Sequence, residues 1–114
     1  MRLSEAVGLL LSLALGGALG PAQAGEADTD DARFTLGRQV FTEQAQPSCS
    51  LCHSLQDAAA AGAIGPDLDQ LKPSAERVMA AVRGGVGVMP AFAASLSAEQ
   101  IEAVAHYVAR VTQP

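Results

Sequence analysis

The sequence predicts a small all-α protein, and three observations carry that prediction. Apolar residues recur at helical spacing over residues 101–111, and a Ser-x-x-Gln capping box at Ser97–Gln100 marks where that helix begins. No segment alternates apolar and polar residues as a half-buried strand does. The 114 residues suffice for one small domain, but with no Trp, one Tyr and three Phe they offer few large side chains for a core. A bound group that fills the centre would make up for this shortage.

The amino-terminal stretch is expected to be a cleaved leader that is not part of the fold. Arg2 opens a short n-region, residues 6–20 are apolar or small, and Pro21-Ala22-Gln23-Ala24 supplies an A-x-A site. This is the layout of a secretory signal peptide with cleavage after Ala24. The alternative is a retained membrane anchor, which is disfavoured because the apolar run is shorter than the about 20 residues that span a bilayer.

The predicted cleavage divides the chain into three parts. These are a signal peptide at 1–24, an acidic tail or first helical turn at 25–32, and a folded domain at 33–114. The net charge of −5 makes nucleic acid a poor partner, because binding to phosphates needs a basic surface. We expect an exported, periplasmic monomer that does not span the membrane after cleavage.

The first helix of the domain is expected over residues 32–44. Phe34, Gly37 and Phe41 fall on one face of it. A glycine inside a helix costs about 1 kcal/mol relative to alanine. We infer that the missing side chain of Gly37 lets another helix approach closely. Pro47 ends the element.

The segment Cys49-Ser50-Leu51-Cys52-His53 has the spacing of an attachment site for c-type haem. Each thiol can add to one vinyl group to form a thioether, and the adjoining imidazole can bind the iron from one face. A dithiol redox pair is a weaker interpretation, since it expects a βαβ setting. A zinc site is weaker still, because the separation of His53 and His106 does not match zinc-ligand spacing. The segment therefore predicts one covalent haem.

The residues after this segment contain a turn. Residues 57–65 are small and alanine-rich and fit either a helix or a loop, whereas Gly65-Pro66-Asp67-Leu68 is a turn signature. A metal-bound imidazole usually donates its other N–H to a carbonyl or a carboxylate, and the turn could bring the Pro66 carbonyl to His53. Leu68 and Leu71 are expected to present apolar side chains to the haem.

Two further helices are predicted. One starts at Pro73 or Ser74 and is stopped by Gly84 and Gly85. The other follows Ser97 and runs to about Thr112. Their apolar positions are Val78, Met79 and Val82 in the first, and Ile101, Val104, Ala105, Val108 and Val111 in the second.

The best candidate for a second axial ligand is Met89. It lies in a glycine-rich segment, and Pro90 biases it toward an extended backbone, which suits a ligand carried on a loop. Met79 lies on a predicted helix and is better explained as a core residue. His106 flanks the apolar stripe of the last helix and is a weaker rival. An iron left open on that side is the remaining alternative.

With these residues placed, the chain resembles the class I cytochromes c, in their small bacterial and photosynthetic-carrier forms. The resemblance runs from about Phe34 to Val111 and rests on matches to the family's first-helix motif, haem site, proline turn, methionine loop and closing helix. The first-helix motif is Gly37-x-x-x-Phe41, and the haem site is Cys49 with Cys52 and His53. The proline turn is Gly65-Pro66-Asp67-Leu68, and the methionine loop begins with Met89-Pro90-Ala91-Phe92. The closing helix is Ile101 to Val108, which contains Tyr107. It implies a compact fold of three or more helices around one covalent haem, with the first and last helices crossing.

These observations predict a periplasmic one-electron carrier and not an enzyme. With His53 and Met89 both on the iron, no coordination position remains for a substrate. We expect the exposed haem edge to be framed by Ser48, Ser50, Leu51, Val88 and Ala91. A redox-protein donor and acceptor are implied, but the sequence does not name them. The alternatives are a dedicated cytochrome subunit of a periplasmic dehydrogenase complex, and a haem enzyme or gas-binding protein with an open iron.

Overall fold

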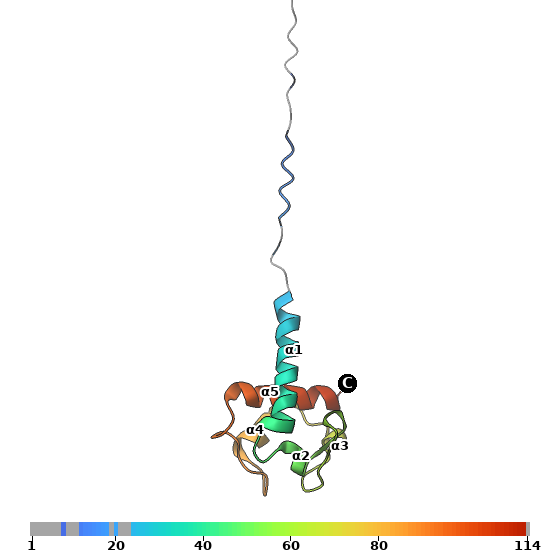
Figure 1. Cartoon of the computed structure of the whole chain (residues 1–114), viewed down its shortest axis with the longest axis vertical. Helices are drawn as coiled ribbons and strands as arrows, with labels where there is room; N and C mark the ends of the chain where they lie inside the picture. Colours follow the sequence, from blue (N-terminus) through green and yellow to red (C-terminus); the bar gives the residue numbers. More distant parts are fainter. Residues whose placement is uncertain (1–7, 9–11, 19, 21–23, 114) are drawn as a thin grey trace, which may run out of the picture.

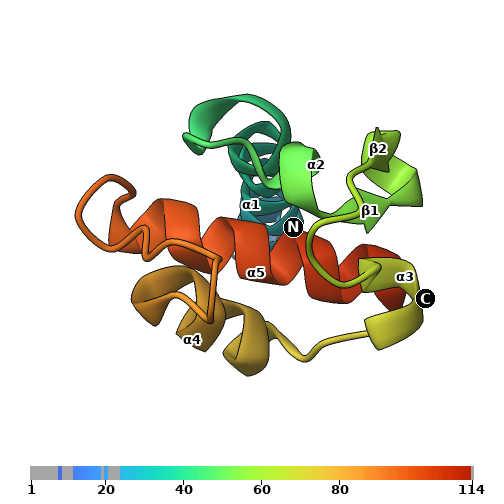
Figure 2. The same ribbon diagram turned by 90° about the horizontal axis from the view of Figure 1, so that it is seen from below.

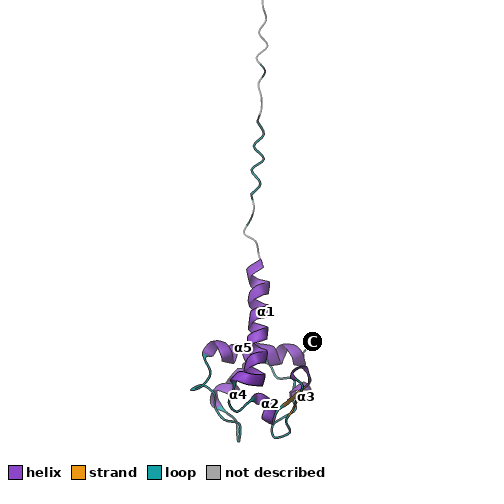
Figure 3. Cartoon of the chain, in the orientation of Figure 1, coloured by secondary structure: helices purple, strands orange, loops and turns teal. Residues whose placement is uncertain are grey.

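The computed structural model describes residues 8, 12–18, 20 and 24–113. This part of the chain is mainly helical with one small two-stranded sheet (Figures 1 and 3). In chain order the elements are helix α1 (Ala24–Gln39), the π-helical turn η1 (Val40–Gln44), α2 (Cys49–Cys52), strand β1 (Ser54–Leu55), the 3-10 turn η2 (Gln56–Ala58), β2 (Ala60–Ala61), α3 (Leu68–Leu71), α4 (Ala75–Gly84) and α5 (Ala98–Thr112).

The predicted signal peptide lies largely outside the described residues. Its n-region and most of its A-x-A site fall on residues 1–7 and 21–23, so leader and cleavage remain predictions. Within the described ranges, no helix combines the length and the apolar composition that crossing a bilayer requires.

The all-α prediction is right for most of the described chain and wrong for one hairpin. Strands β1 and β2 pair antiparallel, with Ser54 opposite Ala61 and Leu55 opposite Ala60. Ala59, in the left-handed conformation with φ of 49°, closes η2 between them. Each strand has only two residues, which is too short for an alternating pattern to appear in the sequence. The hairpin falls partly in the stretch 57–65, whose sequence fits either helix or loop.

Helix α1 begins earlier than the sequence predicts. It starts at Ala24, so the segment 25–32 is helical rather than a tail. Most of this half is exposed and extends away from the other helices (Figure 1). Asp30 ties it to α5, because its carboxylate lies 2.8 Å from Arg110 Nη1 and 3.1 Å from His106 Nε2. The extension is thus held to the fold by the ion pair between Asp30 and Arg110 and by the contact of Asp30 with His106.

The lower part of α1 passes over α5 (Figure 1). Gly37 is buried at the contact, where an added Cβ would overlap the carbonyl of Ala103 and lie 2.5 Å from Tyr107 Cβ. The inference that Gly37 admits a second helix is therefore confirmed, and the partner is α5.

Tyr107 joins α5 to α1 and to the β1–β2 hairpin. Its fully buried ring packs edge-on against Phe34 of α1, with ring centroids 5.2 Å apart. Its hydroxyl donates to Asp57 Oδ2 at 2.5 Å, and Arg38 of α1 donates to the Asp57 carbonyl at 2.8 Å. Asp57 lies in η2, so this network fixes the hairpin against both long helices.

Replacing Tyr107 by phenylalanine is expected to lower the free energy of unfolding by about 1–2 kcal/mol, because the ring stays and one hydrogen bond to a carboxylate is lost. The pKa of Tyr107 lies above its usual value, since burial disfavours the phenolate and Asp57 adds a hydrogen bond and a negative charge. The hydroxyl therefore stabilises the fold fully below a pH of about 10, and this contribution is lost as the pH rises further.

Urea unfolding of the wild type and Y107F, from neutral pH to above the usual tyrosine pKa of about 10, measures both effects. The stability difference should shrink at the alkaline end. A difference that is the same at every pH would contradict the role given to the hydroxyl.

The two other predicted helices are present and capped as expected. Ser74 caps α4 by accepting from the Arg77 amide, and Gly85 follows its last residue. Ser97 and Gln100 form the complete capping box of α5. The core lies between α5, η1 and α4, and its buried apolar side chains include Val40, Phe41, Leu55, Val82, Phe92, Ile101, Val104 and Val108.

Candidate haem site

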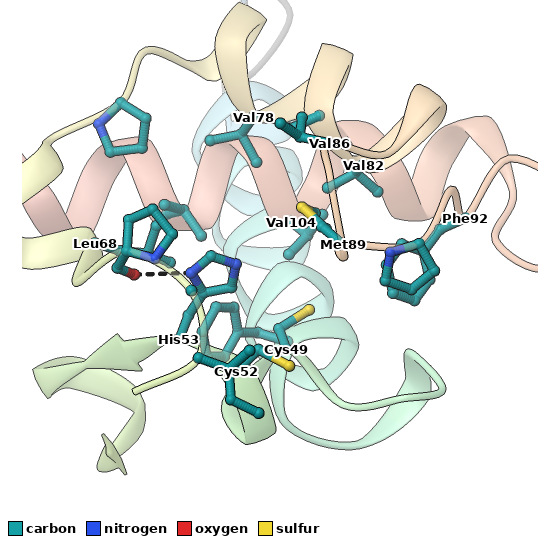
Figure 4. Close-up of a pocket in the computed structure, with 18 of the residues that line it drawn as sticks. Cys49, Cys52, His53, Leu68, Val78, Val82, Val86, Met89, Phe92 and Val104 are labelled. Atoms are coloured by element: carbon teal, nitrogen blue, oxygen red, sulfur yellow. Dashed lines mark hydrogen bonds between the residues drawn. The ribbon is translucent and has the colours of Figure 1, made fainter. Parts of the chain in front are cut away.

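A pocket of about 500 Å³ opens between α2, α4 and the segment that follows α4 (Figure 4). Figure 2 shows the ribbons of α2 and α4 apart from each other. Its volume falls within the range of about 300–1,000 Å³ that is usual for ligand and cofactor pockets. Most of its lining is apolar and includes Phe41, Leu68, Val78, Val82, Phe92 and Val104. An apolar group larger than a single side chain fits these walls.

Cys49 and Cys52 lie one helical turn apart at the α2 wall of the pocket (Figure 4). Ser48 caps this single turn by accepting from the Ser50 amide at 3.3 Å. Both thiols are free and half-buried, and burial raises the pKa of Cys49 to about 11. Since the thiolate is the reactive form in disulfide exchange, this environment weighs against a dithiol redox pair.

His53 follows α2 directly and is oriented by two contacts. Its amide donates to the Cys49 carbonyl at 2.9 Å, and its ring Nδ1 lies 2.8 Å from the Pro66 carbonyl oxygen. A carbonyl only accepts, so Nδ1 carries the proton and Nε2 of the neutral ring keeps its lone pair. Figure 4 shows this second nitrogen facing the pocket. The hydrogen bond expected from Pro66 is present, and it leaves one nitrogen free to bind a metal.

Gly65 fixes the same ring from the side. An added Cβ would lie 2.5 Å from His53 Cε1 and 2.8 Å from Nδ1, so only glycine leaves room for the imidazole there. The Gly65 amide also donates to the Cys52 carbonyl at 2.6 Å. The chain after the hairpin thus closes against the attachment segment and holds its histidine.

Met89 reaches the pocket from another wall, on the segment after α4 (Figure 4). A tight turn carries it, in which the amide of Val86 donates to the Met89 carbonyl at 3.1 Å and the amide of Met89 returns a bond at 2.9 Å. Gly85 precedes the turn with φ of 72°, a conformation that favours glycine. The side chain is half-buried, and its sulfur lies at the pocket.

Neither rival of Met89 belongs to the pocket lining. Met79 lies on α4, partly buried against the core. His106 lies on α5 beside Asp30. The structure therefore brings together Cys49, Cys52, His53, Pro66, Leu68 and Met89, and leaves both rivals elsewhere.

This donor set fits a covalent haem. It combines two free thiols at one wall, an imidazole whose second ring nitrogen faces an apolar pocket, and a thioether from a second wall. Across the described ranges, no three His, Cys, Asp or Glu side chains gather as they would around a metal ion bound by protein alone.

A family model described as cytochrome C oxidase, cbb3-type, subunit III matches residues 32–108. The chain belongs to this family of c-type cytochromes. The class I resemblance is thereby confirmed, and with it a covalent c-type haem and a function in electron transport.

Two relatives agree with this assignment. The c-type cytochrome SorU from Sinorhizobium meliloti has a similar fold, with a TM-score of 0.68 and 51% identity, over 72% of this chain and 93% of that one. Cytochrome c6 from Microcystis aeruginosa is 57% identical over 37 residues, which make up 32% of this chain and 46% of that relative. The match therefore spans less than half of the cytochrome c6.

Two acidic residues that support the site have no motif in the sequence. Asp69 of α3 accepts from the Gln56 amide at 2.8 Å, and Asp57 binds Tyr107 at 2.5 Å. Both restrain the hairpin that follows His53. Isolated aspartates give no pattern to detect, since their partners are 13 and 50 residues away along the chain.

Proposed function

We propose that this c-type cytochrome is a periplasmic one-electron carrier, with Cys49 and Cys52 holding the haem and His53 and Met89 binding its iron. The observation that supports this most directly is the convergence of the free His53 nitrogen and the Met89 sulfur on one apolar pocket (Figure 4). When bound, the haem supplies one iron that alternates between the ferrous and ferric states.

The side chains around the site have separate tasks in this proposal. Pro66 and Gly65 hold the His53 ring so that Nε2 stays aimed into the pocket. The thioether of Met89 favours the reduced state, compared with a second histidine. Leu68 and the apolar walls exclude water, which disfavours the more highly charged oxidised state. Together they favour a relatively high midpoint potential.

Ligands on both sides leave no coordination position for a substrate, which is why a carrier is proposed and not an enzyme. The haem edge is proposed to lie behind an apolar rim. Leu51 and Val88, which are expected from the sequence to frame this rim, are exposed. Ile64 and Val86 are further exposed apolar residues, and both line the pocket. Such a rim suits the small, short-lived contacts of electron-transfer partners.

The proposal is tested on protein exported by a host that attaches haem. Its mass should exceed that of the polypeptide from Gly25 by one haem that survives acid-acetone extraction. The ferric form should show the weak near-infrared band of sulfur bound to iron, and the ferrous form should not bind carbon monoxide. A protein that lacks the band and binds carbon monoxide readily would have an open iron, and the carrier proposal would fail.

A second candidate is a cytochrome subunit held in a stable redox complex, such as that of a periplasmic dehydrogenase. The matching family is described as a subunit of an oxidase, which favours this alternative. Purification from the native source distinguishes the two. A carrier elutes alone, whereas a subunit elutes with a redox enzyme in fixed proportion.

A further inference from the structure

Arg77 places a permanent charge in an otherwise apolar wall. Among the described residues that line the pocket, it alone has a side chain charged at every physiological pH. It lies in the first turn of α4, and helical spacing puts it on the same face as Val78, Ala81 and Val82, which also line the pocket. The pocket-facing stripe of α4 therefore begins with a cation where its other positions are apolar.

The guanidinium of Arg77 has no carboxylate partner in the described part of the chain. The ion pairs found there join Arg38 to Asp57 and Arg110 to Asp30, and His106 lies beside the same Asp30. No acidic side chain lines the pocket. A charge beside an apolar cavity gains most from a negative group that enters the cavity with the ligand.

A haem brings such groups. Its two propionates lie on the edge of the ring away from the vinyl groups. In the proposed function the vinyl edge is bound at α2, and α4 forms a different wall of the pocket (Figure 4). We propose that Arg77 binds a propionate of the haem and keeps it ionised. This inference rests on the proposed attachment through Cys49 and Cys52.

The contact has a measurable consequence. A guanidinium binds a carboxylate through two parallel hydrogen bonds, and its charge holds the carboxylate deprotonated. The propionate should then titrate well below neutral pH, and the midpoint potential should be nearly constant around neutrality. His53 is already bound to Pro66, while Lys72 and Glu76 do not line the pocket. None of these three groups should take over the contact of Arg77 with the propionate.

The test compares three variants of the haem-loaded protein: Arg77→Gln, Arg77→Lys and Arg83→Gln. Arg83 also lies on α4 and is exposed, but it does not line the pocket, so R83Q removes the same charge without the contact. Midpoint potentials are measured across pH, and resonance Raman spectroscopy follows the propionate bending mode. R77Q should lower the potential at neutral pH, move the propionate titration to higher pH and shift the bending mode.

R77K should restore most of the potential and of the titration, and R83Q should match the wild type. Equal titrations and bending modes in R77Q, R83Q and the wild type would overturn the assignment of Arg77. That outcome in a red protein of the correct mass leaves the carrier proposal intact. A colourless protein without the added mass would instead show that the proposed attachment is wrong, and the Arg77 contact with it.

Discussion

Replacing Met89 by alanine is expected to remove the near-infrared sulfur band and to let the ferrous protein bind carbon monoxide. Met89 is the thioether that the Val86–Met89 turn delivers to the pocket, and alanine has no atom able to reach a metal from that position. The midpoint potential should fall by a sizeable part of the roughly 0.8 V that axial ligands span. Near-infrared absorption, carbon monoxide titration and voltammetry measure the three effects.

Met79→Ala is the matched control. It deletes the same atoms from a partly buried methionine that does not line the pocket. This variant should unfold more easily, by about 2 kcal/mol or more, and keep both the band and the potential. If M79A rather than M89A lost the band, the ligand assignment would be reversed. If neither variant lost it, both methionines would be excluded.

Replacing Gly37 by alanine is expected to lower the free energy of unfolding by about 3 kcal/mol or more. The added methyl group would overlap the Ala103 carbonyl, which belongs to the backbone of α5 and cannot rotate aside. The helices must separate, and the packing of Tyr107 against Phe34 would be disturbed with them. The loss far exceeds the gain of about 1 kcal/mol in helix propensity.

Gly84→Ala serves as the control, because an added Cβ there meets nothing within 4 Å. Its stability should equal or slightly exceed that of the wild type. Guanidinium unfolding followed by circular dichroism and by haem absorption gives both values. A G37A protein as stable as G84A would mean that α1 and α5 do not approach as closely as the structure has them.

The sequence predicts the parts of this fold whose signals are local. The capping serines of α4 and α5, the stop at Gly84 and Gly85, and the place of Gly37 all follow from residue type and spacing. The β1–β2 hairpin does not, because two-residue strands carry no periodicity. The early start of α1 is missed as well, since residues 25–32 have no apolar stripe and owe their anchoring to a distant ion pair with α5.

In the candidate site, too, the residues with a local sequence signal are predicted and those that depend on the fold are not. The spacing of Cys49, Cys52 and His53 and the glycine-rich setting of Met89 can be read directly from the chain. The positions of Arg77 and Asp57 cannot, because each matters only through residues that the fold brings near it. An arginine in the first turn of an amphipathic helix looks like any solvated charge until the opposite wall is known.

The apolar pocket has a consequence for the life of the polypeptide before haem is attached. A chain without haem would leave the apolar walls of this pocket facing water, and apolar surface kept from water stabilises a fold by about 25 cal/mol per Å². A chain that has not received its haem would therefore be less stable and more open to proteases. Copies of the chain that receive haem would then survive longer than copies that do not. The amount of this cytochrome in a cell would follow the supply of haem more closely than the rate at which the polypeptide is synthesised.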